Sequence, residues 1–149
     1  KKKGINTDRI IFANRVSISD HLARHKLADL FIDTFPYSAH TTCSDSLWSG
    51  LPLVTLMGNS FASRVGASLL KAVGLKELIT KTKTEYENLI FELSNNSKKL
   101  KDIRKKLEIN KFKMPLFDTK SYTKNLEKSY IKIYERYHKN KSPINIELK

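Results

Sequence analysis

The sequence has few of the residues that build disulfides, zinc sites and membrane spans. It contains one cysteine, Cys43, in 149 residues. No disulfide can therefore form within the chain, and a lone thiol fits a reducing compartment such as the cytoplasm. Neither a C-x-x-C pair nor an H-E-x-x-H motif, the common zinc signatures, is present. No apolar run approaches the roughly 20 residues that cross a membrane. We expect a cytoplasmic protein with no metal site and no membrane contact.

The opening residues do not show the pattern of a secretory signal, and the sequence has no glycine-rich phosphate loop. The opening residues KKKGINTDRI carry charge with no hydrophobic segment behind them, unlike a secretory signal. Residue 1 is Lys instead of Met, which we expect of a fragment or of a processed chain. Glycine occurs five times, and never in the spacing of the motifs that cradle phosphates.

Acidic residues are scarce beside basic ones. The chain has 28 Lys and Arg against 15 Asp and Glu, a net charge of +13, and residues 81–141 hold 17 of the basic residues and 8 of the acidic ones. A basic surface attracts phosphates, whether on nucleic acid, on nucleotides or on a membrane. Here the lysines are spread along helix-like segments without an arginine-rich arm or an aromatic-basic RNA motif. This distribution is typical of a solvated helical surface and does not identify a ligand.

The first half of the chain alternates strand and helix patterns, which predicts an α/β fold. Near-continuous apolar strands separated by helices indicate a parallel sheet covered on both faces. We expect strands at 9–13, 30–34 and 52–57 and a short one at 77–80. Helices are expected at 17–28, capped by Ser17 or Ser19, at 41–50, closed by Gly50, and at 59–74, capped by Asn59 or Ser60 and closed by Gly74.

The second half predicts helices alone, at 83–94, 97–110 and 119–139. The last helix carries an apolar stripe, which is typical of a packing face: Tyr122, Leu126, Tyr130, Ile133 and Tyr137. We expect a partial Rossmann-like nucleotide-binding domain over 1–80, a helical extension packing on it over 81–141 and a flexible tail over 142–149. Three or four parallel strands make a thin sheet. We therefore expect the chain to be the latter part of a doubly wound domain.

The stretch IDTFPYSAHTTCSDSLWSGLPLVTLMG, residues 32–58, holds the candidate site. Open parallel sheets bind ligands at the carboxyl ends of their strands, and here a loop after Asp33 leads into a helix near Thr41. A helix N-terminus presents unpaired N–H groups and about half a positive charge, which suits a phosphate. His40, Thr41 and Thr42 add an imidazole and two hydroxyls at that point. Asp45, one turn further, lies within reach of ribose hydroxyls.

A purely structural interpretation of these residues stays open. Thr42 to Asp45 also fits a capping box, in which hydroxyl and carboxylate satisfy the helix end. A single histidine before a helix is usually structural, and Cys43 fits a small helix residue. Trp48 is assigned to the core. Ser63 and Arg64 belong either to the wall of a donor pocket or to a helix turn packed on the sheet.

The segment LADLFIDTFPYSAHTTCSDSLWSGLPLVTLMGNSFASRVGASLL closely resembles the C-terminal catalytic half of the protein O-GlcNAc transferase family, the SPINDLY-like, TPR-associated glycosyltransferases. The likeness continues through PLFDTKSYTKNLEKSYIKIYERY. The resemblance implies the C-terminal Rossmann-like lobe of a GT-B glycosyltransferase followed by a helical segment. It implies metal-independent transfer of N-acetylglucosamine from UDP-GlcNAc to Ser and Thr of proteins, with no cofactor.

The same resemblance assigns roles to residues. His40, Thr41 and Thr42 would hold the diphosphate, and Asp45 the ribose. Three more matching positions would hold the rest of the nucleotide: Arg24 against the uracil, His21 near the ribose-phosphate edge, and the backbone around Val16 at the uracil edge. Animal relatives carry a lysine near the ribose where this chain has Ile18, so the resemblance does not extend to that contact.

Acceptor binding and the catalytic group are expected outside this chain, in an N-terminal lobe and TPR repeats, so we assign no catalytic residue here. On its own the fragment is expected to be inactive. Two alternatives stay open. One is a related UDP-sugar transferase, such as a protein N-glucosyltransferase; the other is a non-catalytic basic module that binds nucleic acid or an acidic partner.

Overall fold

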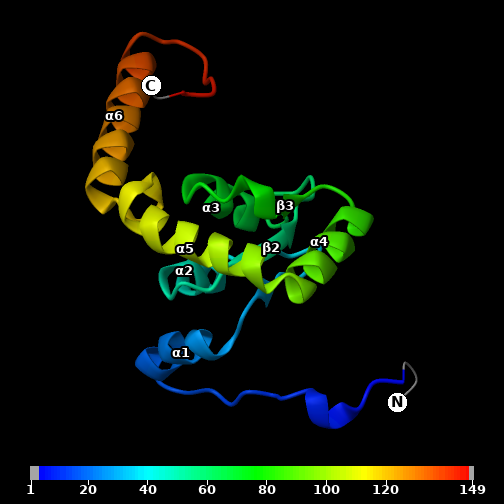
Figure 1. Cartoon of the computed structure of the whole chain (residues 1–149). Coiled ribbons are helices and arrows are strands. Elements are labelled where there is room, and N and C mark those ends of the chain that lie inside the picture. Colours follow the sequence, from blue (N-terminus) through cyan, green and yellow to red (C-terminus); the bar gives the residue numbers. More distant parts are fainter. Residues whose placement is uncertain (1–3, 148–149) are drawn as a thin grey trace.

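A parallel sheet organises the chain. The computed structural model describes residues 4–147, and within them three strands lie in the order β1 (Phe31–Ile32), β2 (Leu53–Leu56), β3 (Ile79–Thr80). Phe31 pairs with Leu53 and Thr55 with Ile79, both in parallel register. The central strand β2 is buried along its whole length, as expected for a strand covered on both faces. The sheet lies in the middle of the main body (Figure 1).

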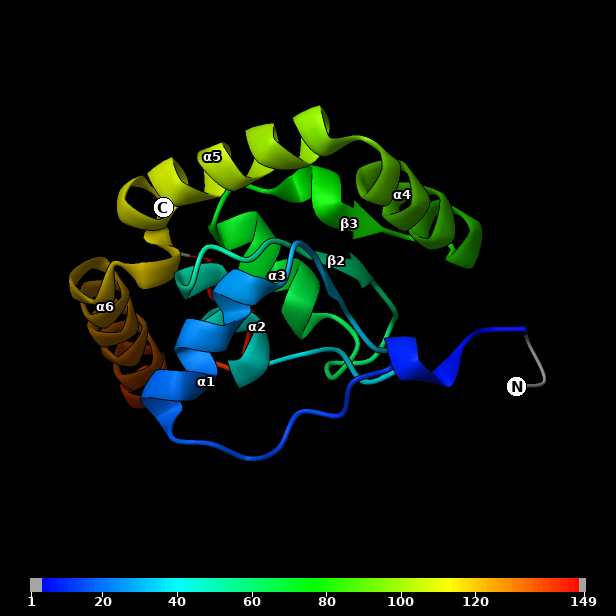
Figure 2. The ribbon, with the colours of Figure 1, turned by 60° about the horizontal axis from the view of Figure 1, so that its bottom comes forward.

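Helices cover this sheet and then extend beyond it. They are α1 (Ile18–Arg24), α2 (Thr41–Trp48), α3 (Val65–Ala72), α4 (Lys83–Asn95), α5 (Ser97–Lys113) and α6 (Thr119–His138). Short 3₁₀ turns occur at Thr7–Arg9, His25–Leu27, Lys76–Leu78 and Pro115–Phe117. Figure 2 shows α4 and α5 on one side of the strands and α2 and α3 on the other. The fold class expected from the sequence, a partial parallel sheet flanked by helices and followed by helices, is confirmed.

One hydrophobic core joins the strands to four helices. Its buried members come from β2, from α2 to α5 and from the link between α3 and β3: Cys43, Leu47, Leu53, Val54, Leu70, Val73, Leu75, Leu78, Leu93, Ile103 and Leu107. The buried residues of α4 and α5 belong to this same cluster. Helix α6 has no buried residue among those described, and it projects away from the body (Figure 1).

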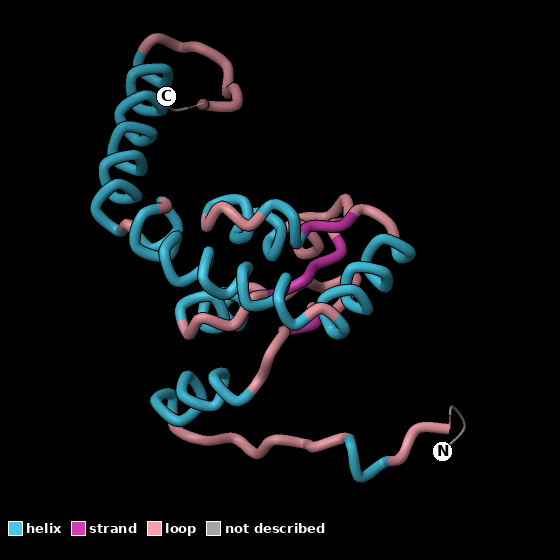
Figure 3. Tube along the Cα trace, in the orientation of Figure 1, coloured by secondary structure: helices cyan, strands magenta, loops and turns pink. Residues whose placement is uncertain are grey.

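The strand expected at 9–13 is wrong. After the turn at Thr7–Arg9 these residues run as loop (Figure 3), with Ile11 87% and Phe12 90% exposed. A strand needs a neighbour for its N–H and C=O groups. Within residues 4–147, β1 pairs on one side with β2, and no other strand lies along its far edge. The apolar pattern is present, and its pairing partner is not.

Two further local expectations need correction. Helix α3 begins at Val65, after Asn59 and Ser60, because residues 60–63 instead form a turn in which Ser63 N–H donates to Ser60 Oγ. Trp48 is 48% exposed and packs edge-on against Phe117, so it lies at the margin of the core. The predicted ends at Gly50 and Gly74 are confirmed, with positive φ of 83° and 77°.

Most of the apolar stripe of α6 stays exposed within the described residues. Tyr122, Tyr130, Ile133 and Tyr137 are each more than half exposed. Beyond α6 the chain turns and runs back along the helix without regular structure, as far as Glu147; residues 148 and 149 of the expected tail lie outside the described residues. Among residues 4–147, no helix is both long and apolar enough to cross a membrane.

Candidate functional site

The carboxyl end of β1 delivers the chain into α2 through loop 34–40. His40 is the N-cap of α2, and its side chain makes no capping hydrogen bond. The N–H groups of Cys43 and Ser44 donate to His40 O at 3.1 and 3.2 Å. The N–H groups of Thr41 and Thr42 have no acceptor among the described residues. The first turn of α2 therefore offers unpaired donors at the edge of the sheet, as an anion site requires.

The side chain of His40 is held between two aromatic rings. Tyr37 stacks on the imidazole with ring centroids 4.9 Å apart and an interplanar angle of 19°. Phe61 meets it edge-on at 5.9 Å. The imidazole Nε2 lies 3.3 Å from Ala62 O. These contacts fix the ring beside the helix N-terminus, and the sequence analysis identified neither Tyr37 nor Phe61.

The capping-box interpretation of Thr42 and Asp45 is wrong. The N-cap is two residues earlier than Thr42, at His40, and α2 starts without a side-chain cap. Thr41 and Thr42 are exposed, while Asp45 is half-buried one turn further along. Within residues 4–147 none of these three side chains makes a hydrogen bond to another residue. Their hydroxyl and carboxylate groups are available to a ligand.

A buried acid holds the loop before α2 through hydrogen bonds. Asp33, at the end of β1, is 4% exposed. Its Oδ1 accepts from Thr34 N and Ala39 N at 2.9 and 2.7 Å, and its Oδ2 accepts from Thr55 Oγ1 at 2.6 Å. The sequence placed Asp33 at the end of a strand without giving it a role, although an acid after an apolar strand was a visible signal.

His21, Arg24 and Val16 form a second group on and before α1. Arg24 Nη2 donates to His21 Nδ1 at 2.6 Å, and Arg24 Nη1 donates to Asn14 O at 2.9 Å. The bond to Asn14 O holds the loop that carries Val16 against the helix. Ile18 is 80% exposed. Figure 1 shows α1 on the side of the body that carries α2, but no hydrogen bond between described residues joins the two groups.

Metal ligands and a reactive thiol are both missing from the described part of the site. Residues 4–147 contain no cluster of three or more His, Cys, Asp or Glu residues that could hold a metal ion. Burial raises the pKa of the Cys43 thiol to about 12, with a smaller contribution from the Asp33 carboxylate. A thiol of this kind stays protonated and unreactive.

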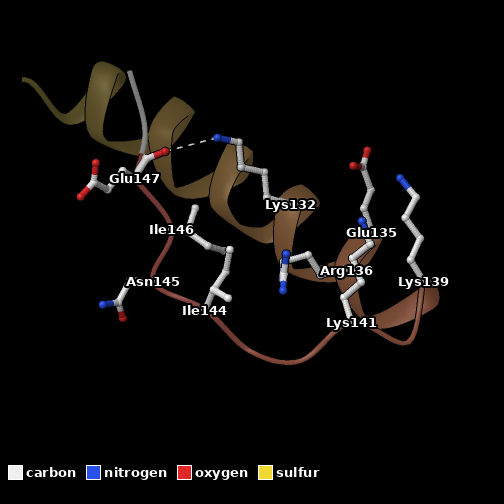
Figure 4. A pocket seen from close by; sticks show the side chains of 9 residues that line it. All are labelled: Lys132, Glu135, Arg136, Lys139, Lys141, Ile144, Asn145, Ile146 and Glu147. Carbon is white, nitrogen blue, oxygen red and sulfur yellow. Dashed lines mark hydrogen bonds between the residues drawn. The ribbon is translucent and has the colours of Figure 1, made fainter.

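One hollow lies beside this site, and another lies far from it. A hollow of 470 Å³ is lined in part by Met57, Phe61 and Arg64, so it shares Phe61 with the contacts of His40. This places Arg64 in a pocket wall, while Ser63 is buried in its turn. A second hollow, of 320 Å³, lies between α6 and residues 141–147 (Figure 4). It contains no residue singled out for nucleotide binding.

Comparisons with known proteins place the chain in a family. A model described as glycosyl transferase family 41 matches residues 1–126. The chain is 40% identical over 124 residues, 83% of its length, to the probable UDP-N-acetylglucosamine–peptide N-acetylglucosaminyltransferase SPINDLY of Hordeum vulgare. It is 36% identical over 136 residues, 91% of its length, to the UDP-N-acetylglucosamine–peptide N-acetylglucosaminyltransferase of Caenorhabditis elegans. It spans 13% and 12% of those two proteins.

A solved structure agrees with both matches. A mutant of the Thermobaculum terrenum O-GlcNAc transferase superposes with a TM-score of 0.81 and 33% sequence identity. The superposition covers 87% of this chain and 25% of the other. The strands and helices described above therefore correspond to one part of a larger structure.

Proposed function

Because the chain belongs to glycosyl transferase family 41, we propose that it is the donor-binding part of a protein O-GlcNAc transferase. Such an enzyme transfers N-acetylglucosamine from UDP-GlcNAc to Ser and Thr of proteins. The observation that carries the proposal is the open first turn of α2, where unpaired N–H groups, two free hydroxyls and a fixed imidazole meet. A nucleotide sugar is the ligand class that fits both this anion site and a glycosyltransferase family.

The leaving group explains why these groups are needed. When the glycosidic bond breaks, negative charge develops on the diphosphate of UDP. The N–H groups of Thr41 and Thr42 and the positive end of α2 stabilise that charge. The two hydroxyls donate further hydrogen bonds, and the His40 ring lies beside them. Because all these groups are in place before the reaction, no reorganisation is required.

The nucleoside would be held by residues on both sides of the diphosphate. Asp45 accepts hydrogen bonds from the ribose hydroxyls. His21 lies at the ribose-phosphate edge, Arg24 against the uracil, and the backbone at Val16 reads the uracil edge. The pairing of Arg24 with Asn14 O supports this arrangement, because it orders the loop that carries Val16.

The remaining parts of the reaction are assigned outside this chain. We place the catalytic group and the acceptor protein with an N-terminal lobe and a TPR region, and we assign the enzyme to the cytoplasm. No cofactor or metal ion takes part. A related transferase with another donor sugar or acceptor, such as a protein N-glucosyltransferase, stays an alternative, because the groups named above would contact the nucleotide and not the sugar.

Titration of the 149-residue chain with UDP, followed by amide NMR, tests the proposal. We expect shifts at His40, Thr41 and Thr42, unchanged by magnesium or EDTA. ADP shares the diphosphate and lacks the uracil. It should therefore shift the amide signals of the first turn of α2 and leave the amide signal of Val16 unchanged. Shifts confined to the basic residues around the 320 Å³ hollow would contradict the site. A steep dependence of affinity on salt would favour a polyanion instead.

A further inference from the structure

Asp33 is a buried acid that nucleotide binding, as described above, does not use. It stands at the carboxyl end of β1 with 4% of its surface exposed. A carboxylate so shielded cannot touch a bound nucleotide. Its negative charge near a diphosphate would also weaken the binding of that anion. A buried charge is costly unless its hydrogen bonds compensate, so its position calls for an explanation.

The hydrogen bonds of Asp33 close loop 34–40 on itself. Oδ1 accepts from Thr34 N, at the start of the loop, at 2.9 Å. The same oxygen accepts from Ala39 N, at the end of the loop, at 2.7 Å. Ala39 precedes His40, the N-cap of α2. One oxygen atom therefore ties together the two ends of the loop, immediately before the proposed diphosphate site.

Asp33 is itself held by three other elements: β2 and α3 contact its carboxylate, and α4 contacts its backbone carbonyl oxygen. Oδ2 accepts from Thr55 Oγ1 on β2 at 2.6 Å. Gly66, in α3, approaches so closely that a Cβ there would lie 2.9 Å from Oδ2. The hydroxyl of Tyr86, on α4, donates to Asp33 O. The position of Oδ1 is thus set by the core of the protein.

We propose that Asp33 is a positioning residue for the diphosphate site, acting through Ala39 N–H to place His40 and the first turn of α2. This inference rests on the proposed function, because it needs a ligand at that turn. What Asp33 supplies is an acceptor in a fixed place. Asn at position 33 can offer one carbonyl oxygen to the same two N–H groups, whereas Ala cannot.

Three variants of the 149-residue chain separate this role from simple stability. Asp33→Ala removes the acceptor, and Asp33→Asn keeps one and removes the charge. Gly66→Ala leaves Asp33 intact, favours the helix and pushes on Oδ2. The control Thr80→Val removes a different buried hydrogen bond, from Thr80 Oγ1 to Thr55 O at 2.9 Å, without touching the loop. UDP affinity, thermal stability and hydrogen exchange of the Ala39 amide are measured for each.

We expect Asp33→Ala and Gly66→Ala to weaken UDP binding by at least about tenfold, with faster exchange at Ala39. Asp33→Asn should stay within about threefold of the parent, and Thr80→Val should lose stability without losing affinity. Parent affinity in Gly66→Ala, or tenfold loss in Thr80→Val, overturns the inference; so does a folded Asp33→Ala that binds like the parent. If Asp33→Ala does not fold, Gly66→Ala and Asp33→Asn decide. A parent chain that fails to bind UDP contradicts the proposed function itself.

Discussion

At the scale of single residues, Asp45 is where ligand binding and helix stability separate most clearly. Its side chain makes no hydrogen bond within residues 4–147, and the cap of α2 lies at His40. Asp45→Ala should therefore weaken the binding free energy of UDP by about 1–3 kcal/mol, the cost of a lost charge-assisted hydrogen bond. The free energy of unfolding should change by less than about 0.5 kcal/mol. Calorimetric titration and urea unfolding measure the two quantities.

The neighbouring Ser44→Ala is the matched control, since Ser44 is also half-buried on α2 and has no proposed contact with the nucleotide. It should leave UDP affinity unchanged. Equal losses of affinity in both variants would show that any change on this turn disturbs the helix, and the proposed role of Asp45 as a ribose ligand would be wrong.

Cys43 gives a second test at this scale, based on its pKa. Burial, and secondarily the Asp33 carboxylate, raises the pKa of Cys43 from 9.0 to about 12. The folded protein therefore binds more protons than the unfolded chain between these values. Stability should be fully present below pH 9 and fall as the pH rises toward 12. The raised pKa of Tyr86, caused by burial and then by Asp33, acts in the same direction.

Labelling with iodoacetamide at pH 8 should accordingly be slow in the native chain and fast in urea. Cys43→Ala should show a smaller loss of stability between pH 9 and pH 12, with the Tyr86 contribution remaining. Rapid labelling of the folded protein would mean that α2 opens readily and that its first turn is not a fixed anion site.

Much of the candidate site was predictable from the sequence, and the missing part has a physical cause. The pattern of strand, loop and helix placed His40, Thr41, Thr42 and Asp45 at the sheet edge, because that edge follows from the parallel topology alone. The clamp on His40 was not predictable. Its partner Phe61 lies in the turn after β2, and that turn depends on hydrogen bonds such as the one from Ser60 N–H to Ser63 Oγ.

At the scale of elements, α4 depends on a complete capping box. Thr82 Oγ1 accepts from Glu85 N, and the Glu85 carboxylate accepts from Thr82 N. Thr82→Ala should cost about 1 kcal/mol of stability, measured by urea unfolding. Thr84→Ala, on the exposed first turn of the same helix, is the control and should be neutral or slightly stabilising. Equal effects of the two changes would exclude the cap as the cause.

The elements themselves were predictable wherever the local pattern determines them. Gly50 and Gly74 marked the ends of α2 and α3 through their positive φ, and the polar gap before Ser97 separated α4 from α5. The strand expected at 9–13 does not form, because a strand needs a hydrogen-bonded neighbour as well as an apolar pattern. Its apolar side chains remain exposed, since no partner strand for them lies within residues 4–147.

Helix α6 shows the same principle for a helix. Its period predicts an apolar face, and the structure has that face, but Tyr122, Tyr130 and Tyr137 all lie exposed on it. The sequence determined the helix and its stripe. Which surface covers a stripe is set by the rest of the fold and cannot be read from one helix.

At the scale of the whole molecule, the decisive distinction is between part of an enzyme and an enzyme. Sugar transfer requires the donor to be held, the leaving diphosphate to be stabilised and an acceptor hydroxyl to be aligned with the anomeric carbon. In the proposed site, the turn at His40 to Thr42 addresses the first two. For the third, the described residues offer no candidate: His40 is held between Tyr37 and Phe61, and Cys43 is protonated and buried.

We therefore expect the 149-residue chain to bind UDP weakly and to transfer no sugar. Alignment of reactants accounts for about 7–11 kcal/mol of a barrier, so a chain that aligns no acceptor should show no measurable turnover. Incubation with labelled UDP-GlcNAc and a cell lysate, with and without EDTA, measures transfer directly. The double variant His40→Ala, Asp45→Ala sets the background, because it removes the proposed donor contacts and leaves the rest of the surface unchanged. Labelled protein above that background would place the catalytic group within this chain, and the assignment of acceptor alignment to another part of the enzyme would be wrong.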